Sequence, residues 1–323
     1  MAIKFFKRTL GFYVLLFVLT PGYGQQSEKK SDVLNLKEIK TTLAQDVSFL
    51  ASDSLNGRAL GTVGYDLATD YVIKQFETYG IQPFFKTYND SFLVNDIKTK
   101  NIVGVVKGND SLLSKEYIVL GAHLDHIGTA KVIGGDSIAN GANDNATGVS
   151  VVLALAKHFA TMKSIKRSLI FVLFGAEESG LVGSKHLANK LKELNTPIYT
   201  MLNFEMVGMP MDGKKYVAYL TGYSKSNMAE KLNDYGDKEW IGFLPKAKQY
   251  QLFKRSDNYS FYKELEVPSH TLSTFDFSNY DFYHHVDDEA DKMNYDFMSD
   301  LVELIIPAVT AMANTTENEI LLN

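Results

Sequence analysis

Hydrophobic positions recur with two different spacings along the chain, and these spacings predict helices and strands. Ile39, Leu43, Val47 and Leu50 lie three or four residues apart, which is typical of the buried face of a helix that begins near residue 37. Similar patterns predict helices at residues 67–83, 145–160, 180–194 and 289–314. A segment rich in glycine and polar residues, 52–66, separates the first two and predicts a loop.

Five apolar runs predict strands, at residues 101–108, 117–128, 168–178, 198–208 and 215–222. Apolar strands that alternate with helices indicate a sheet buried on both faces, with mostly parallel strands. We therefore expect an α/β fold: a single domain with a largely parallel, mixed central sheet flanked by helices on both faces. In such folds, ligands bind outside the carboxyl ends of the strands.

Charged side chains and imidazoles gather where these strands end. Glu177 and Glu178 follow one apolar run, and Glu205 ends another. Because the chain has no cysteine, a transition-metal site must use histidine and carboxylate ligands, which suit zinc, manganese or cobalt. The candidates at strand ends, in the loop before the helix at 145–160 and near the C-terminus are His123, Asp125, Asp144, Glu177, Glu178, Glu205, His284, His285 and Asp288.

Several of these residues also have a purely structural interpretation. His123 and Asp125 could be a surface histidine beside an acid, the two glutamates could stabilise the start of a helix, and Asp144 could cap one. Glu205 is harder to explain in this way, because a lone carboxylate in an apolar run is costly to bury. Convergence of so many acids on one sheet edge requires a cation. We also expect the Asp125 carboxylate to accept the second imidazole N–H of His123.

The first 24 residues have the pattern of a secretory signal peptide. Lys4, Lys7 and Arg8 precede an apolar run at 10–20, and small residues at 22 and 24 offer a cleavage site. An uncleaved N-terminal anchor is the alternative, whereas a lipoprotein would need a cysteine after the apolar run. Residues 25–36 are polar and predict a mobile leader. We expect a secreted or periplasmic protein with no stable membrane insertion after cleavage.

Composition and charge exclude some partners. The 323 residues are 45% hydrophobic, enough for a large core. The formal net charge is −5 and falls to near −8 without residues 1–24, which hold three cations and no acid. No basic patch occurs, so nucleic acid and anionic membranes are poor candidate partners.

Five motifs occur in the order typical of the M28 family of zinc peptidases, and the chain resembles the two-zinc aminopeptidases of that family. They are "GAHLDHIG", "NGANDNATG", "FGAEESGLVGSKH", "NFEMVGM" and "FYHHVDDEADK", and residues 49–83 are similar to the N-terminal segment of the family. The resemblance implies a peptidase domain over residues 37–316, followed by a C-terminal tail at 317–323.

The resemblance also implies a role for each candidate. His123 and Glu205 would hold one zinc ion, Glu178 and His284 the second, and Asp144 would bridge both. Asp125 would orient His123, Asp288 would support the site, and Glu177 would be the general base for a metal-activated water. His284 is preferred to His285, which lies where the family varies.

Three positions depart from the family pattern. Glu205 stands where an aspartate is frequent, Asn143 replaces an acid beside Asp144, and Asn258 stands in place of a histidine. The last difference puts a substrate role for residues 255–258 in doubt, and we expect a turn there.

The resemblance thus implies a zinc-dependent exopeptidase, most simply an aminopeptidase acting on peptides with a free N-terminus. Segments 248–253 and 278–282 are candidates to line its substrate pocket. One alternative is a glutaminyl cyclase-like acyltransferase on the same fold, although the chain has a single tryptophan, Trp240, away from the motifs. The other is an inactive binding domain.

Overall fold

The computed structural model describes Met1, residues 35–162 and residues 164–323. Contacts divide the chain into Met1–Asp32 and Val33–Asn323. All elements described below belong to the second unit, which we call the domain. The predicted signal peptide, apart from Met1, and residues 25–34 of the predicted leader lie outside the described residues.

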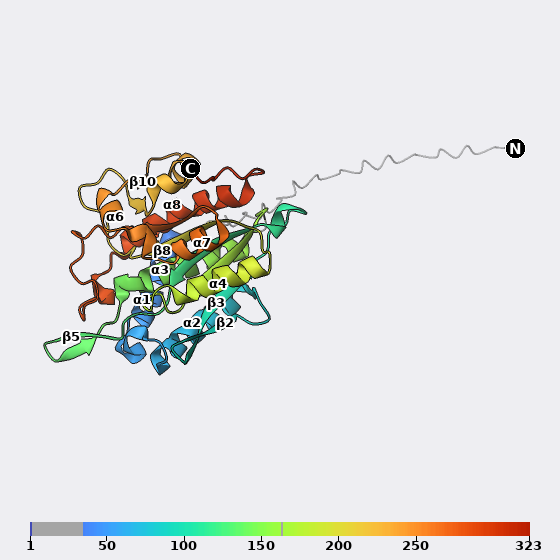
Figure 1. Cartoon of the computed structure of the whole chain (residues 1–323). Coiled ribbons are helices and arrows are strands. Elements are labelled where there is room, and N and C mark those ends of the chain that lie inside the picture. Colours follow the sequence, from blue (N-terminus) through green and yellow to red (C-terminus); the bar gives the residue numbers. More distant parts are fainter. Residues whose placement is uncertain (2–34, 163) are drawn as a thin grey trace. The chain divides into compact units, whose positions relative to one another are not determined.

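A mixed sheet of nine strands forms the centre of the described part of the domain (Figure 1). Its order is β1-β3-β7-β4-β8-β11-β9-β10, and β2 also pairs with β3. The neighbours β7, β4, β8 and β11 are parallel, whereas β1, β2 and β3 on one side and β9 on the other join through antiparallel pairs. The strands are β1 (Gln82–Pro83), β2 (Asn89–Val94), β3 (Ile97–Val106), β4 (Tyr117–His123), β7 (Ser168–Phe174), β8 (Ile198–Glu205), β9 (Ala218–Leu220), β10 (Ile241–Gly242) and β11 (Ser269–Ser273).

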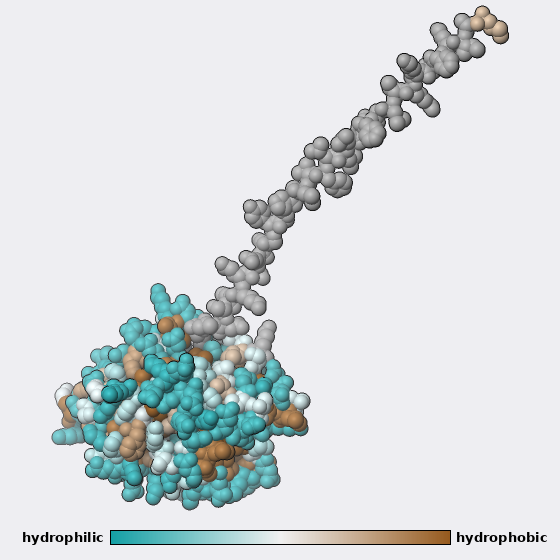
Figure 2. All heavy atoms as spheres, turned by 90° about the horizontal axis from the view of Figure 1, so that it is seen from above, coloured by the Kyte–Doolittle hydropathy of each residue, from teal (hydrophilic) through white to brown (hydrophobic). Residues whose placement is uncertain are grey.

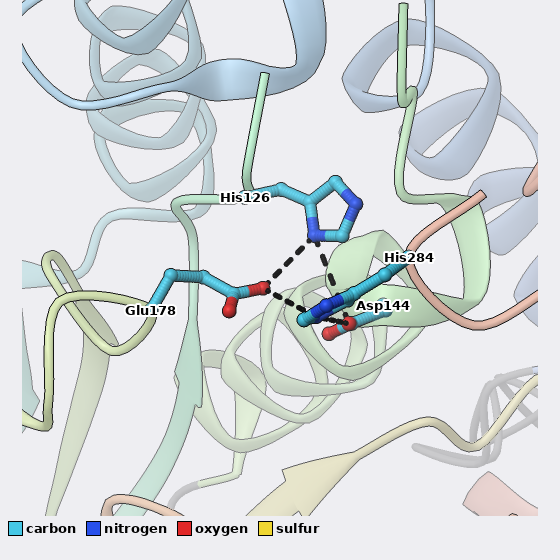
Figure 3. A group of neighbouring side chains, drawn as sticks. All are labelled: His126, Asp144, Glu178 and His284. Carbon is cyan, nitrogen blue, oxygen red and sulfur yellow. Dashed lines mark hydrogen bonds and ion pairs between the residues drawn. The ribbon is translucent and has the colours of Figure 1, made fainter. Parts of the chain in front are cut away.

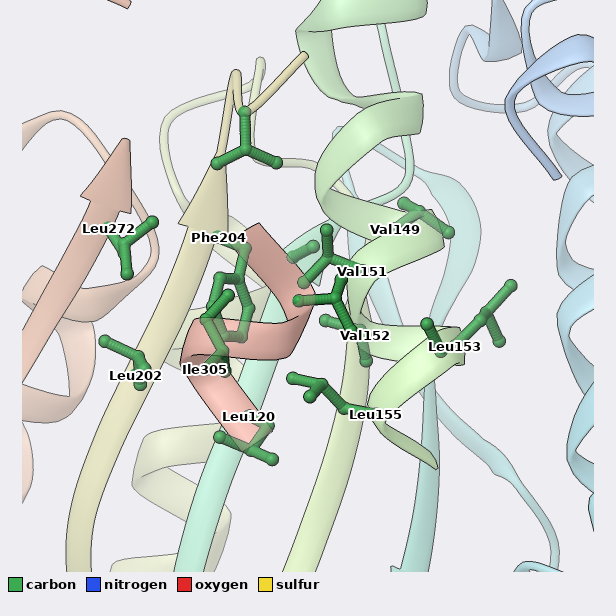
Figure 4. Packing of buried hydrophobic residues seen from close by; sticks show 14 of the residues in the cluster. Leu120, Val149, Val151, Val152, Leu153, Leu155, Leu202, Phe204, Leu272 and Ile305 are labelled. Atoms are coloured by element: carbon green, nitrogen blue, oxygen red, sulfur yellow. The ribbon is translucent and has the colours of Figure 1, made fainter. Parts of the chain in front are cut away.

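Helices cover both faces of this sheet, as the apolar strands predicted. Along β7, Leu169 and Phe171 pack into one hydrophobic cluster, whereas Ile170 and Val172 pack into another, because successive side chains of a strand point to opposite faces. The first cluster, part of which Figure 4 shows, includes side chains of α1 (Leu36–Leu50), α2 (Val63–Tyr79), α3 (Thr147–Thr161) and α8 (Tyr295–Asn314). The second includes side chains of α4 (Val182–Glu193) and α7 (Asn258–Leu265). The α/β fold class is confirmed.

Smaller elements complete the domain. A two-stranded hairpin, β5 (Thr129–Ile133) and β6 (Asp136–Ile138), stands apart from the main sheet. Two short helices, α5 (Met228–Tyr235) and α6 (Pro245–Gln249), lie between β9 and α7 in the sequence. The predicted loop at 52–66 contains a short 3-10 segment at Asp53–Arg58.

Strand β11 was not predicted, and its composition explains why. Its sequence, Ser-His-Thr-Leu-Ser, has a single large aliphatic side chain, Leu272, yet all five residues are buried. The polar ones are satisfied by hydrogen bonds: Thr271 Oγ1 donates to Asn258 Oδ1, and His270 Nδ1 donates to the Thr221 carbonyl. A pattern of apolar residues cannot reveal such a strand.

The C-terminal residues 317–323, predicted as a tail, lie against the domain. Ile320 is buried and its N–H donates to Tyr199 Oη at 2.8 Å, while Leu322 forms a β-bridge with Ser226. Figure 2 shows one face of the domain, which carries mostly hydrophilic side chains interrupted by small hydrophobic patches. None of the helices in the described ranges combines the length and apolar character that a membrane span needs.

Candidate metal centre

The candidate residues meet at one edge of the sheet because three of the strands before them are parallel neighbours. His123 is the last residue of β4 and Glu205 the last residue of β8, while Glu177 and Glu178 follow the end of β7. Since β4 pairs in parallel with both β7 and β8, the three carboxyl ends lie side by side. Asp144 reaches this edge from the segment before α3, and His284 from the segment after β11.

Four side chains converge on one point beyond this edge (Figure 3). Each of His126, Asp144, Glu178 and His284 offers one ligand atom, and these four atoms all lie within 4.8 Å of one another. His284 Nε2 is 3.2 Å from Glu178 Oε1 and 3.3 Å from Asp144 Oδ2. His126 Nδ1 is 3.1 Å from Glu178 Oε1 and 3.7 Å from Asp144 Oδ2.

Asp144 also faces a second histidine through its other oxygen. His123 Nε2 lies 3.2 Å from Asp144 Oδ1, on the side of the carboxylate that does not face His284. Glu205 is close enough to both residues for their charges to influence its pKa. Asp144 therefore stands between the four-residue group and a second group made by His123 and Glu205.

The described donors fit a zinc ion. His123 Nε2 and His284 Nε2 are buried and close to Asp144, yet neither makes a hydrogen bond with it, and Glu205 Oε2 is also buried without a hydrogen-bond partner. Imidazole nitrogens and carboxylate oxygens that gather around shared points, several of them without a hydrogen-bond partner, are the arrangement that metal ligation requires.

Asp125 supports the site in a different way from the one we predicted. The imidazole Nδ1–H of His123 donates to the backbone carbonyl of Asp125 at 3.0 Å, not to its carboxylate. The carboxylate instead accepts the backbone N–H groups of Glu177 at 3.1 Å and of Glu178 at 3.3 Å. The prediction of a carboxylate–imidazole pair was therefore wrong, because the chain after β4 brings the carbonyl of Asp125, and not its carboxylate, to the ring.

Asp288 holds the main chain of Asp144, the residue that stands between the two groups. Its carboxylate accepts the N–H of Asn143 at 2.7 Å and of Asp144 at 3.1 Å, and it also accepts the hydroxyl of Tyr280 at 2.6 Å. The segment around Asp144 is further tied to the end of β8, since Asn145 Nδ2 donates to the Phe204 carbonyl.

A buried arginine beneath the centre was not singled out from the sequence. Arg58 is fully buried, and its guanidinium donates to four backbone carbonyls in three segments, namely those of Leu50, Leu124, Asn140 and Gly141. Burial lowers its pKa to about 10, against the opposing effect of nearby carboxylates such as Asp144 and Asp288. It therefore stays charged at neutral pH and offsets part of the negative charge of the site.

Without a cation, the protein groups at the centre shift the pKa values of His284 and Glu205 strongly. Burial lowers the pKa of His284, but the adjacent carboxylates of Asp144 and Glu178 outweigh it and raise the pKa to about 10. Burial raises the pKa of Glu205 to about 7, and Asp144 and Glu178 contribute in the same direction. A divalent cation relieves both effects, because it stabilises the carboxylates and the neutral imidazoles together.

Glu177 lies next to Glu178 in the sequence but does not belong to the four-residue group. Burial raises the pKa of Glu177 well above its ordinary value, and the neighbouring Glu205 and Asp257 raise it further, against the opposing effect of His123. A carboxyl group with a raised pKa accepts a proton more readily than an ordinary glutamate, as a general base requires.

A cavity of about 80 Å³ opens beside Glu205. Leu252, from the predicted segment 248–253, lines it, whereas the other predicted segment, 278–282, does not. Half of its twelve lining residues are aromatic or apolar, and the other half carry hydroxyl or charged groups, Arg255 among them. The remaining lining residues are Glu205, Met206, Tyr219, Thr221, Ser256, Thr271, Ser273, Phe275, Phe277 and Tyr283.

Other local predictions have mixed outcomes. The structure brings His284 rather than His285 to the group, since His285 Nδ1 accepts the N–H of Asp287 instead. Residues 255–258, predicted as a turn, lead directly into α7, and Asn258 there has a structural role: its Nδ2 donates to the Phe253 carbonyl. His126 was missed, although it stands three residues after His123 in the same motif.

The fold and the site together define the class of protein. It is an α/β protein in which imidazoles and carboxylates gather at the carboxyl ends of parallel strands, as zinc ligands do. Comparison with known families makes the assignment specific. The model of peptidase family M28 matches residues 101–309, which is more than half of the chain. The chain therefore belongs to peptidase family M28, as its motifs predicted.

Relatives and solved structures agree with this assignment. The chain is similar to leupeptin-inactivating enzyme 1 of Streptomyces exfoliatus, with 32% identity over 181 residues that cover 55% of this chain and 37% of that enzyme. It spans about two fifths of the length of the curated relatives it matches.

Two solved structures have the same fold. One is an aminopeptidase from Aneurinibacillus sp. strain AM-1, with a TM-score of 0.65 and 17% identity over 86% of this chain and 95% of that one. The other is a glutaminyl cyclase from Porphyromonas gingivalis, also with a TM-score of 0.65, with 15% identity over 86% of this chain and 99% of that one. Because both identities are low, these similarities concern the fold alone.

Proposed function

We propose that this protein is a zinc-dependent aminopeptidase. The observation that carries the proposal is the convergence of four ligand atoms within 4.8 Å, next to a glutamate with a raised pKa, in a member of family M28. Two cation positions are proposed. His284 and Glu178 would serve one, His123 and Glu205 the other, and Asp144 would bridge them.

In the proposed chemistry, the metal and the protein side chains have different roles. Bound zinc supplies Lewis acidity, which lowers the pKa of water and polarises a peptide carbonyl. Glu177 takes a proton from the attacking water and returns it to the leaving amine. Asp125 holds the backbone of Glu177 and Glu178, so that one glutamate faces the metal while its neighbour stays available for proton transfer.

The surroundings of the site support a substrate with a free N-terminus. Carboxylates outnumber cationic side chains there, which favours a positively charged amine. The cavity beside Glu205 presents aromatic side chains such as Phe275 and Tyr283 and suits an apolar first residue. Glu205, which lines this cavity, is also a proposed ligand, so a side chain held there would place its own peptide bond near the metal.

The decisive experiment compares the purified protein with its Glu177→Gln variant on a panel of aminoacyl-nitroanilides. The wild type is expected to hydrolyse unblocked substrates, with a preference for apolar residues, and to contain zinc. Glu177→Gln should lose activity by about 10²–10⁴-fold, because it removes the proton acceptor, and should keep its metal. Full activity in the variant would contradict the proposed base.

Blocked substrates and a glutaminyl peptide serve as controls for the rival functions. An N-acetylated substrate should resist cleavage if the free amine is recognised. Cyclisation of an N-terminal glutamine would instead favour an acyltransferase, although Trp240 is buried and its indole N–H donates to the Leu232 carbonyl rather than facing the site. Zinc binding without hydrolysis of any substrate would favour an inactive binding domain.

We also propose that the protein acts outside the cytoplasm, in the periplasm or the medium. This rests on the signal-like pattern of residues 1–24. N-terminal sequencing of the protein from its native cell should find Gln25 first, whereas a protein that still begins at Met1 would contradict cleavage.

A further inference from the structure

We propose that His126 is a fourth protein ligand of the cation position formed by Asp144, Glu178 and His284, and that the two cation positions are therefore unequal. One position would have four protein ligands, and the other would have three, namely His123, Asp144 and Glu205. The inference rests on the proposed function, because it assumes that the centre binds metal.

The spacing of the donor atoms carries this inference. Four ligands at zinc bond lengths of about 2.0–2.1 Å form a tetrahedron whose edges are about 3.3 Å long. His284 Nε2 lies 3.2 Å from Glu178 Oε1 and 3.3 Å from Asp144 Oδ2. His126 Nδ1 lies 3.1 Å and 3.7 Å from the same two oxygens. His126 Nδ1 thus approaches the same two oxygens as His284 Nε2, and the two nitrogens lie within 4.8 Å of each other (Figure 3).

The surroundings of His126 hold its ring in this direction. The residue is buried, and its backbone N–H donates to the Arg58 carbonyl at 3.3 Å. Gly141 packs so closely against the ring that a side chain at that position would come within 2.5 Å of His126 Cδ2. The other ring nitrogen, Nε2, is buried without a hydrogen-bond partner among the described residues, so Nδ1 is the nitrogen that faces polar groups.

A simpler role for His126 is to position Glu178. The Nδ1–H would then donate to Glu178 Oε1, and the ring would make no bond to the metal. The two roles predict different imidazole counts at the metal. A ligand contributes its own nitrogen to the coordination sphere, whereas a positioning residue does not.

Ligation by His126 has a consequence for the two positions. A zinc ion held by four protein ligands has the coordination of a structural site, whereas three ligands leave a place for water or substrate. The cation position that includes His126 should therefore bind the first zinc equivalent tightly. The position of His123 and Glu205 should bind the second equivalent more weakly and should be the more open one.

X-ray absorption at one zinc equivalent per chain tests the inference on the unmodified protein. Two imidazoles per zinc are expected, from His126 and His284. A single imidazole in the wild type would overturn the proposal. A wild type that binds no zinc would overturn both this proposal and the proposed function, so the two failures are distinguishable.

Stepwise zinc titration of the His126→Gln variant provides the second measurement. Glutamine keeps an N–H donor for Glu178 but lacks the imidazole nitrogen, so the first binding step should weaken by more than the roughly 10–100-fold that loss of a positioning residue costs, and the imidazole count should fall to one. His285→Gln is the matched control, since His285 is nearby but outside the group, and it should leave both measurements unchanged. Wild-type affinity in His126→Gln would overturn ligation.

Discussion

Individual buried acids in this domain are stabilised by different partners, and the difference decides what each one does. Asp288 accepts two backbone N–H groups and a tyrosine hydroxyl, so its carboxylate serves as a fixed support for Asp144. Asp144 faces three imidazoles, which hold its pKa well below the ordinary value although burial alone would raise it. Asp46 in α1 has fewer hydrogen-bond partners. Its Oδ1 accepts the hydroxyl of Tyr71, and its Oδ2 has no hydrogen-bond partner.

Asp46 gives a prediction on pH-dependent stability. Burial raises its pKa from 3.8 to about 7, against the opposing effects of Tyr71 and Lys157. Between these values the folded protein holds a proton that the unfolded chain has released, so the contribution of Asp46 to stability is lost as the pH rises from about 4 to 7. Asp46→Asn should remove this loss and raise the free energy of unfolding at pH 8 by up to about 4 kcal/mol.

Urea unfolding of wild type and Asp46→Asn at pH 4.5 and pH 8 measures this effect. The two proteins should differ much more at pH 8 than at pH 4.5. Asp70→Asn, an exposed position on α2, is the control and should behave as the wild type at both values. An equal difference at the two pH values would show that Asp46 does not titrate in this range.

At the scale of elements, the centre depends on segments that do not belong to any strand. The segment after β4 and the segment before α3 carry His126 and Asp144, and Arg58 joins them by donating to the carbonyls of Leu124, Asn140 and Gly141. A single guanidinium thus ties together the two segments that carry these candidate residues.

Arg58→Lys should therefore weaken both the fold and the metal centre. An ammonium group has three donors and cannot reach all four carbonyls, so the free energy of unfolding should fall by about 2–4 kcal/mol. Zinc affinity, measured by competition with a chelator, should fall as well, because the two segments are no longer held together.

Arg167→Lys is the matched control for that experiment. Arg167 is also buried, but it lies just before β7, at the opposite end of the sheet, where it pairs with Glu116 and donates to the Met312 and Thr315 carbonyls. The Arg167→Lys variant should be destabilised with unchanged zinc affinity. Equal loss of zinc affinity in both variants would mean that Arg58 acts through global stability alone.

At the scale of the whole molecule, the parallel centre of the sheet concentrates negative charge at one edge. Asp125, Asp144, Glu177, Glu178 and Glu205 all lie there, and Arg58 alone cannot balance them. Bound cations should therefore contribute to stability as well as to chemistry, because only the folded chain brings these ligands together.

Removal of the metal should lower the melting temperature of the wild type by roughly 5–10 °C. A ligand present at about 1,000 times its Kd contributes about 4 kcal/mol, and a domain of this size loses about 2 °C or somewhat more per kcal/mol. Thermal unfolding with and without a chelator measures the shift. Asp144→Ala should show almost no shift, since both of the proposed cation positions would lose a ligand. Identical wild-type curves after complete removal of zinc would contradict a stabilising role.

Much of the fold and of the centre could be predicted from local pattern. The apolar runs identified the parallel strands β4, β7 and β8. The polar residues at or just after the ends of these strands, His123, Glu178 and Glu205, were thereby identified as candidates. Strand β11 and helix α7 were missed because polar residues such as Thr271 and Asn258 are buried there through hydrogen bonds to partners distant in the sequence.

The sequence by itself determined which residues are available for chemistry: an oxygen and nitrogen ligand set without cysteine, carried at strand ends in the order of family M28. Only the tertiary structure decided which atoms meet. It directed His123 to a carbonyl instead of a carboxylate, brought His126 beside His284, and joined the segments after β4 and before α3 through Arg58. The physical reason is that these contacts depend on the path of turns and the direction of buried side chains, which packing of distant segments fixes and local pattern does not encode.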